Sequence, residues 1–246
     1  MATAAHTETK WWGGGRSPFN VEYGKLMMWY FLMSDAFTFG AFLISYGTIR
    51  FSQNFWPDPN HVFNALPFFG HANLPLAFVS LMTFILIISS VTMVLAVHAG
   101  HHMDKKGVIK WMSWTIVGGF AFLGCQAWEW THLITGEHAA MVNGQLKLIG
   151  TTVTQNPWGP AIPGLIHDGM QVGKTGPVAF GGYFFGITGF HGFHVFLGGT
   201  MLAIVLRRMI RGDFTADNHF AFEGAAWYWH FVDVVWLGLY IAVYWM

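Results

Sequence analysis

Ionisable side chains inside apolar segments are the residues of this sequence most able to do chemistry. Asp35 lies in WYFLMSDAFTFG, and Glu223, His230 and Asp233 lie in or at the edge of the apolar run 222–246. A charged group in membrane hydrocarbon is costly and usually has a partner or a function. Two interpretations of Asp35 stand: a carboxylate that exchanges protons or binds a partner, or a carboxyl kept neutral by burial and bonded to a neighbouring helix.

Two histidines, His191 and His194, lie three residues apart in TGFHGFHV. On a helix they share one face, as a haem or metal ligand pair would. No cysteine or carboxylate motif accompanies them, so the sequence favours interhelical hydrogen bonding and no metal site. Gly182 and Gly186 in the same segment form a small-residue face that lets another helix approach.

The last apolar segment carries a polar stripe, because Glu223, Trp227 and His230 recur at spacings of four and three. Asp233, three residues further on, is a candidate partner of His230. Glu223 lies within reach of the arginines that precede this segment. Structural ion pairs are the favoured interpretation, ahead of catalysis.

Glu129 and His132 in QAWEWTH are also three apart, and we expect them to pair with each other near the membrane interface. Four further polar residues follow the second apolar segment: His98, His101, His102 and Asp104. Because histidine changes charge near neutral pH, this cluster could gather protons. The alternative is a solvated interfacial turn, and the sequence does not separate the two.

The elements that must position these residues are membrane helices. The chain of 246 residues is 54% hydrophobic and 10% charged, against about 25% charged in soluble domains. Five stretches reach the roughly 20 residues needed to cross a membrane: 26–49, 74–97, 111–134, 179–206 and 225–246. They are apolar on all sides, which excludes a barrel. We therefore predict an all-α, polytopic five-helix bundle in a single domain spanning 1–246.

Positive charge predicts the orientation of the bundle. Nine lysines and arginines fall before the first span or in the loops 98–110 and 207–224, and three fall on the other side. This places the N-terminus in the cytoplasm and the C-terminus on the outer side. The long outer loop 135–178, which contains NPWGPAIPG, is predicted to form an ordered lid or a partner-docking segment.

Several functional classes find no support in the sequence. Basic and acidic residues balance at 12 each, so nothing suggests a nucleic-acid partner, and residues 1–22 lack the apolar core of a signal peptide. The single cysteine, Cys125, cannot form an internal disulfide. There is no phosphate loop, nucleophile elbow, CxxC pair or haem-attachment motif, so no self-sufficient active site is evident.

Two long motifs carry a family resemblance. Phe222–Trp236 (FEGAAWYWHFVDVVW) resembles the last-helix signature of subunit III of the haem–copper cytochrome c oxidases, and Thr188–Val195 resembles its penultimate-helix motif. QAWE at 126–129 and the inner loop at Asp104 are similar to the same family. The likeness covers roughly residues 23–134 and 180–246. Two departures are the Ser34-Asp35 step, where the family usually has glutamate, and five helices instead of seven, as in the bacterial form.

The resemblance implies a non-catalytic core subunit of a proton-pumping cytochrome c oxidase in aerobic respiration, located in a bacterial inner membrane. Its partners would be subunits I and II, which hold the haem and copper, membrane phospholipid, a cytochrome c-type donor to the complex, and a candidate respiratory supercomplex. This chain would hold no cofactor except bound phospholipid. Alternatives are a subunit III of a quinol or nitric-oxide-type enzyme and a b-haem electron carrier that uses His98, His191, His194 or His230.

On this reading the polar residues divide into three groups. Those related to proton uptake are Asp35, His98, His101, His102 and Asp104. Those that bind lipid are Arg208, Trp227 and His230. Those with a structural role are Glu129, His191, His194, Glu223 and Asp233.

Overall fold

Five membrane-length helices form the body of the protein, as the sequence predicts. The computed structural model describes residues 21, 23–52, 56, 63, 76–135, 138–142, 145–149, 166–167, 170–171, 178–214 and 220–245. The helices are α1 (Tyr23–Ser52), α3 (Ala77–His101), α4 (Lys105–Thr135), α5 (Val178–Arg211) and α6 (Phe220–Leu239). The last helix continues as a π-helix, η2 (Tyr240–Trp245).

Most helices extend past the apolar stretch that predicts them, mainly at the ends rich in Lys and Arg. The helix α4 begins at Lys105 and not at 111, and α5 continues to Arg211. Apolar length measures the part of a helix inside the hydrocarbon, while the hydrogen-bonded helix runs on into the polar interface. We call this end of the bundle the basic end; it holds Lys25, Lys105 and Arg208.

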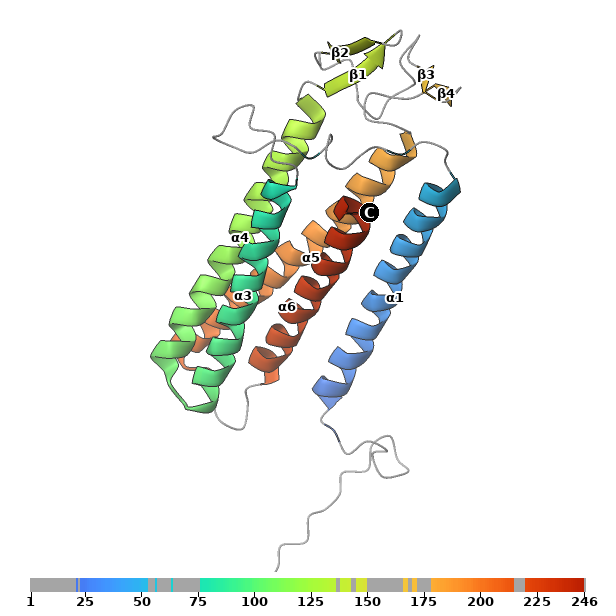
Figure 1. Cartoon of the computed structure of the whole chain (residues 1–246). Coiled ribbons are helices and arrows are strands. Elements are labelled where there is room, and N and C mark those ends of the chain that lie inside the picture. The colour runs from blue at the N-terminus through green and yellow to red at the C-terminus, as the bar shows by residue number, and fades with distance from the viewer. Residues whose placement is uncertain are drawn as a thin grey trace, which may run out of the picture.

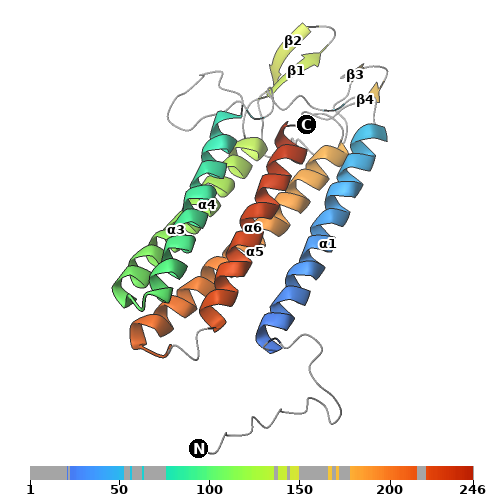
Figure 2. The same ribbon diagram turned by 60° about the horizontal axis from the view of Figure 1, so that its bottom comes forward.

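The opposite end carries two short antiparallel hairpins within the long loop between α4 and α5 (Figures 1 and 2). The strand β1 (His138–Val142) pairs with β2 (Gln145–Ile149), and β3 (Ile166–His167) pairs with β4 (Met170–Gln171). We call this the hairpin end. The prediction of a lid or docking segment falls largely on residues outside those described.

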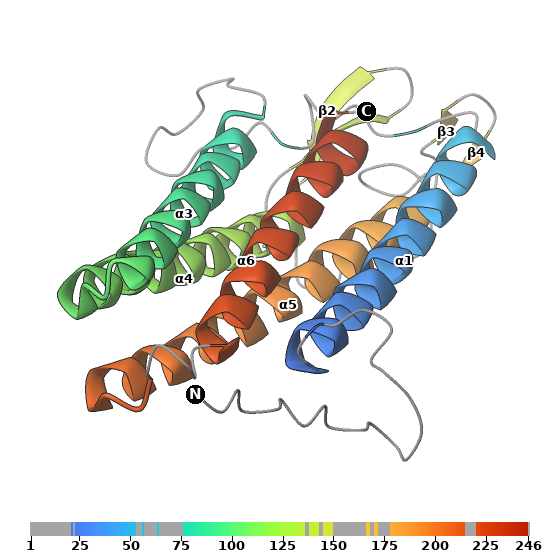
Figure 3. The same cartoon turned by 90° about the horizontal axis from the view of Figure 1, so that it is seen from below.

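The helices pack in a layered bundle in which α3 lies along α4, and α6 lies along α5 (Figures 1 and 3). Indole N–H groups of α6 reach hydroxyls of α3: Trp229 donates to Ser89 (2.9 Å) and Trp236 donates to Thr83 (3.0 Å). These bonds satisfy the indole donors inside the core, where an unpaired donor is costly.

The glycines at which helices approach closely are not Gly182 and Gly186, which the sequence suggested. A Cβ on Gly119 of α4 would collide with the Trp229 ring, and one on Gly198 of α5 would lie 2.9 Å from Tyr228. At Gly182 and Gly186 a Cβ would meet nothing within 4 Å in the described part of the chain. Glycine therefore admits the aromatic rings of α6 between α4 and α5.

The first helix is the least embedded, and it lies beside α5 and α6, away from α3 and α4 (Figure 3). Its buried residues are Phe39 and Tyr46. Three polar contacts spread along its length join it to the bundle: Lys25–Glu223, Asp35–His194 and Ser45–Tyr183. In lipid the hydrophobic effect does not hold helices together, so such contacts weigh more in the attachment of α1.

Candidate functional site

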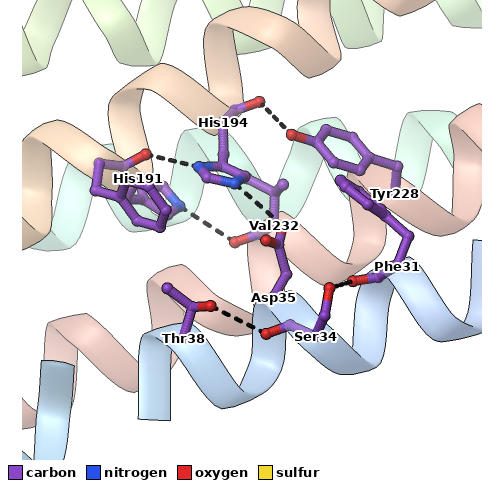
Figure 4. Close-up of polar contacts among 9 residues, drawn as sticks. Phe31, Ser34, Asp35, Thr38, His191, His194, Tyr228 and Val232 are labelled. Atoms are coloured by element: carbon purple, nitrogen blue, oxygen red, sulfur yellow. Dashed lines mark hydrogen bonds and ion pairs between the residues drawn. The ribbon is translucent and has the colours of Figure 1, made fainter. Parts of the chain in front are cut away.

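The best-defined polar site joins the middle of α1 to α5 (Figure 4). Oδ2 of Asp35 lies 3.1 Å from Nε2 of His194, and both side chains are largely buried. The other ring nitrogen of His194, Nδ1, lies 2.8 Å from the carbonyl oxygen of Phe190, one turn earlier on α5. The histidine is thus fixed from two sides.

The hydrogen bond to Phe190 fixes which ring nitrogen of His194 carries a hydrogen. A carbonyl oxygen can only accept, so Nδ1 of His194 must carry a hydrogen and donate it to Phe190. Nε2 of His194 then faces Oδ2 of Asp35 at ion-pair distance, 3.1 Å, and this oxygen is buried without a hydrogen-bond partner among the described residues. A carboxyl beside an imidazole forms a pair with no net charge, either as two neutral groups or as an ion pair, and this lowers the cost of placing the two groups in a membrane.

Aromatic groups enclose the pair. The Tyr228 hydroxyl on α6 donates to the carbonyl oxygen of His194 (3.2 Å), and the Phe39 ring lies edge-on to the imidazole with centroids 5.3 Å apart. On α1 the neighbouring hydroxyls bond to their own helix, Ser34 to Phe31 and Thr38 to Ser34 (Figure 4). Asp35 therefore points alone from this face of α1 toward α5.

His191, one turn away, has a different environment. Its Nε2 donates to the carbonyl oxygen of Val232 on α6 (3.2 Å), and its Nδ1 is buried without a hydrogen-bond partner among the described residues. The ring lies against Trp236 and Phe122. The two histidines thus bond to different helices, which fits the interhelical hydrogen bonding that the sequence favoured.

A second polar group lies between α3 and α6. Ser90 Oγ is 2.6 Å from His230 Nδ1, and both carboxyl oxygens of Asp233 are buried without a hydrogen-bond partner in the described chain. The expected pairing of His230 with Asp233 within α6 is therefore replaced by a bond to α3. Three-residue spacing makes two groups neighbours, but it does not decide which partner each one prefers.

A third group lies toward the hairpin end, around Glu129 of α4. Its Oε2 accepts hydrogen bonds from the Gln126 amide (3.0 Å) and from the Tyr244 hydroxyl (2.9 Å). The expected partner His132 instead stacks on Trp128, with centroids 5.3 Å apart and planes 3° from parallel. The π-helical turn of η2 buries Val243 and Tyr244 together, and so presents the phenol to Glu129.

At the basic end, Glu223 forms an ion pair with Lys25 of α1, with Nζ and Oε2 3.4 Å apart. The guanidinium of Arg208 lies 3.7 Å from Asp213 and over the ring of Phe214. Arg208 remains about half exposed, whereas Trp227, on the same stripe as Glu223, is half-buried.

The histidine cluster lies at the turn between α3 and α4 and is exposed. His102 Nδ1 donates to the carbonyl oxygen of His98 (2.9 Å), and their rings lie 4.5 Å apart. His101 lines a cavity of about 380 Å³ together with Lys105 and Glu223. Asp104 directly precedes α4, and its carbonyl oxygen accepts a hydrogen bond from the Val108 amide.

The histidines proposed for haem ligation do not meet as an axial pair would. His98 lies eight residues beyond Ser90, the partner of His230, which is roughly 12 Å along α3. His191 and His194 bond to Val232 and to Asp35. Within the described ranges no three His, Cys, Asp or Glu side chains come together as a metal site would require.

Sequence reasoning missed the partners on other helices. Tyr228, Ser90, Tyr244 and Lys25 complete the four polar groups, yet each has an ordinary place in an apolar or terminal segment. Gln126 lies on the same helix as Glu129, three residues earlier, and this spacing was a signal that it could be a partner.

Comparison with known proteins gives a consistent result. A family profile described as "Cytochrome c oxidase subunit III" matches residues 174–246. The chain is 34% identical over 225 residues to cytochrome c oxidase subunit 3 of Struthio camelus, covering 92% of this chain and 69% of the relative. The Salmo salar protein of the same name is 34% identical over 230 residues with the same coverage. That of Tetraodon nigroviridis is 39% identical over 165 residues, or 67% of this chain and 49% of the relative.

Proposed function

The chain belongs to the cytochrome c oxidase subunit III family, and from this premise we propose that it is a non-catalytic core subunit that supports proton uptake and sustained turnover of a proton-pumping oxidase. It does so beside the partner subunits I and II, which hold the haem and copper. Electrons reach the complex from a cytochrome c-type donor. The complex lies in a bacterial inner membrane.

The observation that carries this proposal is the Asp35–His194 pair, a carboxyl and an imidazole 3.1 Å apart that join two helices in the middle of the membrane span. A pair that stays neutral while its proton shifts from one partner to the other can exchange that proton without leaving a bare charge. The shorter side chain, aspartate where the family usually has glutamate, still reaches its histidine at 3.1 Å.

We also propose that the subunit binds phospholipid at its basic end. Arg208 is exposed enough to meet a phosphate, and Lys105 and His101 border the cavity beside it. Basic residues close to the membrane surface attract anionic headgroups. Trp227 and His230 lie further along α6, where they would contact the acyl chains of the bound lipid.

Charge also supports the proposed orientation. The lysines and arginines described at the basic end are Lys25, Lys105, Lys106, Lys110, Arg207, Arg208 and Arg211. At the hairpin end, Arg50 near the end of α1 is basic. By the positive-inside rule the basic end, with the start of α1, faces the cytoplasm and the histidine cluster faces the proton source.

The test replaces Asp35 in the intact complex and compares proton uptake and active lifetime with those of the wild type. In Asp35→Asn the amide can still donate to Nε2 of His194, so the helix contact persists while the titratable carboxyl is lost. We expect normal assembly with haem-containing partners, slower proton uptake in vesicles and a shorter active lifetime. Asp35→Glu should keep most of both functions.

The control is Ser45→Ala, which removes another polar contact of α1 and no titratable group. Wild-type proton uptake and lifetime in Asp35→Asn would overturn the proton role and leave a purely structural contact. Purification of the chain without haem-containing partners would count against the core-subunit assignment itself.

A further inference from the structure

A small cavity at the hairpin end borders the buried carboxyl of Glu129. Its volume is about 10 Å³, and it is lined by the side chains of Phe63, Phe78, Val79, Trp128, Glu129, His132 and Leu133. Five of these are apolar, so the polar groups on its wall are a carboxyl and an imidazole. A volume of this size admits one water molecule.

Glu129 has one carboxyl oxygen without a partner in the described part of the chain. The residue is 5% exposed, and Oε2 already accepts from Gln126 and Tyr244. Oε1 is buried and has no hydrogen-bond partner among the described residues. A buried carboxyl oxygen without a partner costs free energy, and in proteins such groups are commonly satisfied by ordered water.

We propose that this cavity is an internal water site in which one water bonds to Oε1 of Glu129 and to the ring of His132, and that it lets Glu129 exchange a proton with the hairpin-end surface. The water has the two polar partners that a stable buried water needs. Glu129 and His132, which do not pair directly, are joined through it.

His132 provides the outward step of this route. It lies one turn after Trp128, near the end of α4, and is partly exposed, whereas Glu129 is enclosed. Its stacking on Trp128 holds the ring at the cavity wall. Glu129 is thus closed toward the core by Gln126 and Tyr244 and open toward the surface through a single water. This site is separate from the Asp35–His194 pair and does not rest on it.

Two measurements on the purified complex test the proposal. In a cryo-EM map fine enough to show ordered water, a peak should lie within hydrogen-bond distance of Oε1. Infrared difference spectroscopy should show a carboxylic acid band that Glu129→Gln removes and that shifts in heavy water. In His132→Phe, which keeps the stacking on Trp128, the exchange should slow by about tenfold, the factor for one lost hydrogen bond.

The control is Thr131→Ala, which removes an exposed hydroxyl beside His132 that bonds to the Ala127 carbonyl and does not line the cavity. It should leave the exchange rate unchanged. A map without the water peak overturns the site. Unchanged exchange in His132→Phe, or no band assignable to Glu129, overturns the proton route. If Glu129→Gln fails to assemble, the map and the His132→Phe exchange rate still decide the question.

Discussion

Asp35 on α1 and His194 on α5 face each other with 3.1 Å between Oδ2 and Nε2, and the histidine is turned toward the carboxyl by its bond to the Phe190 carbonyl. The contact joins the least embedded helix to the core at its midpoint. This contact therefore has two consequences, because it places a carboxyl beside an imidazole and it holds α1 against α5.

The structural part of this contact predicts non-additive mutations. Asp35→Ala and His194→Ala should each destabilise the complex by about 1–3 kcal/mol, because each leaves the other group buried and unpaired. The double variant should cost less than the sum by about 0.5–3 kcal/mol. Thermal unfolding midpoints of the four proteins measure this.

The matched control combines Asp35→Ala with Tyr183→Phe. Tyr183 joins α5 to α1 through its bond to Ser45. Asp35 and Tyr183 therefore lie at the same helix pair but are not bonded to each other. Its effects should add. Additive effects in the Asp35–His194 cycle as well would show that the pair contributes no coupling.

The packing of Trp229 predicts that one glycine is far more sensitive than another on the same helix. A Cβ on Gly119 would collide with the Trp229 ring, so Gly119→Ala should cost about 1–3 kcal/mol through overpacking and disturb the bond to Ser89. At Gly124 a Cβ would meet no described atom within 4 Å. Gly124→Ala should be neutral or slightly stabilising, since alanine favours helix. Equal midpoints in the two variants would contradict the packing seen at Gly119.

The exposed histidines predict a pH-dependent change in proton delivery. Replacing His98, His101 and His102 by glutamine should slow proton uptake, by about tenfold at most, with the largest effect near neutral pH where histidine changes charge. Stopped-flow uptake across a pH series measures it. The control is Thr48→Ala, which removes a hydroxyl at the other end of the bundle and no titratable group. An unaltered pH profile would leave the cluster as a solvated turn.

Sequence reasoning recovered what depends on local composition. Apolar length identified five helices, and charge bias separated the basic end, because both are summed over many residues. The start of α4 at Lys105 was not predicted, and the apolar stretch began only at 111. Apolar length does not detect the part of a helix that continues into the polar interface.

Helix pairing lay beyond the sequence. Glu129 and His230 were each assigned a partner three residues away, whereas the structure gives Glu129 the Tyr244 phenol and His230 the Ser90 hydroxyl. Spacing reports neighbours on one helix only, and the preferred partner depends on which helices pack together. The same reason explains why Asp35 was identified and His194 was not recognised as its partner.

The last prediction concerns Arg208 at the basic end. It distinguishes lipid binding by this residue from a role in stabilising the end of α5. Arg208 contacts Asp213 and the Phe214 ring, so it also stabilises the end of α5. A cation near an anionic headgroup contributes about 1 kcal/mol, so Arg208→Ala should weaken phospholipid binding about fivefold. Arg207→Ala, at the exposed neighbouring position, is the control and should retain more lipid. Phosphorus quantitation of the delipidated and re-lipidated complex measures both. Equal retention in the two variants would remove Arg208 from the lipid site and leave it the structural role at the end of α5.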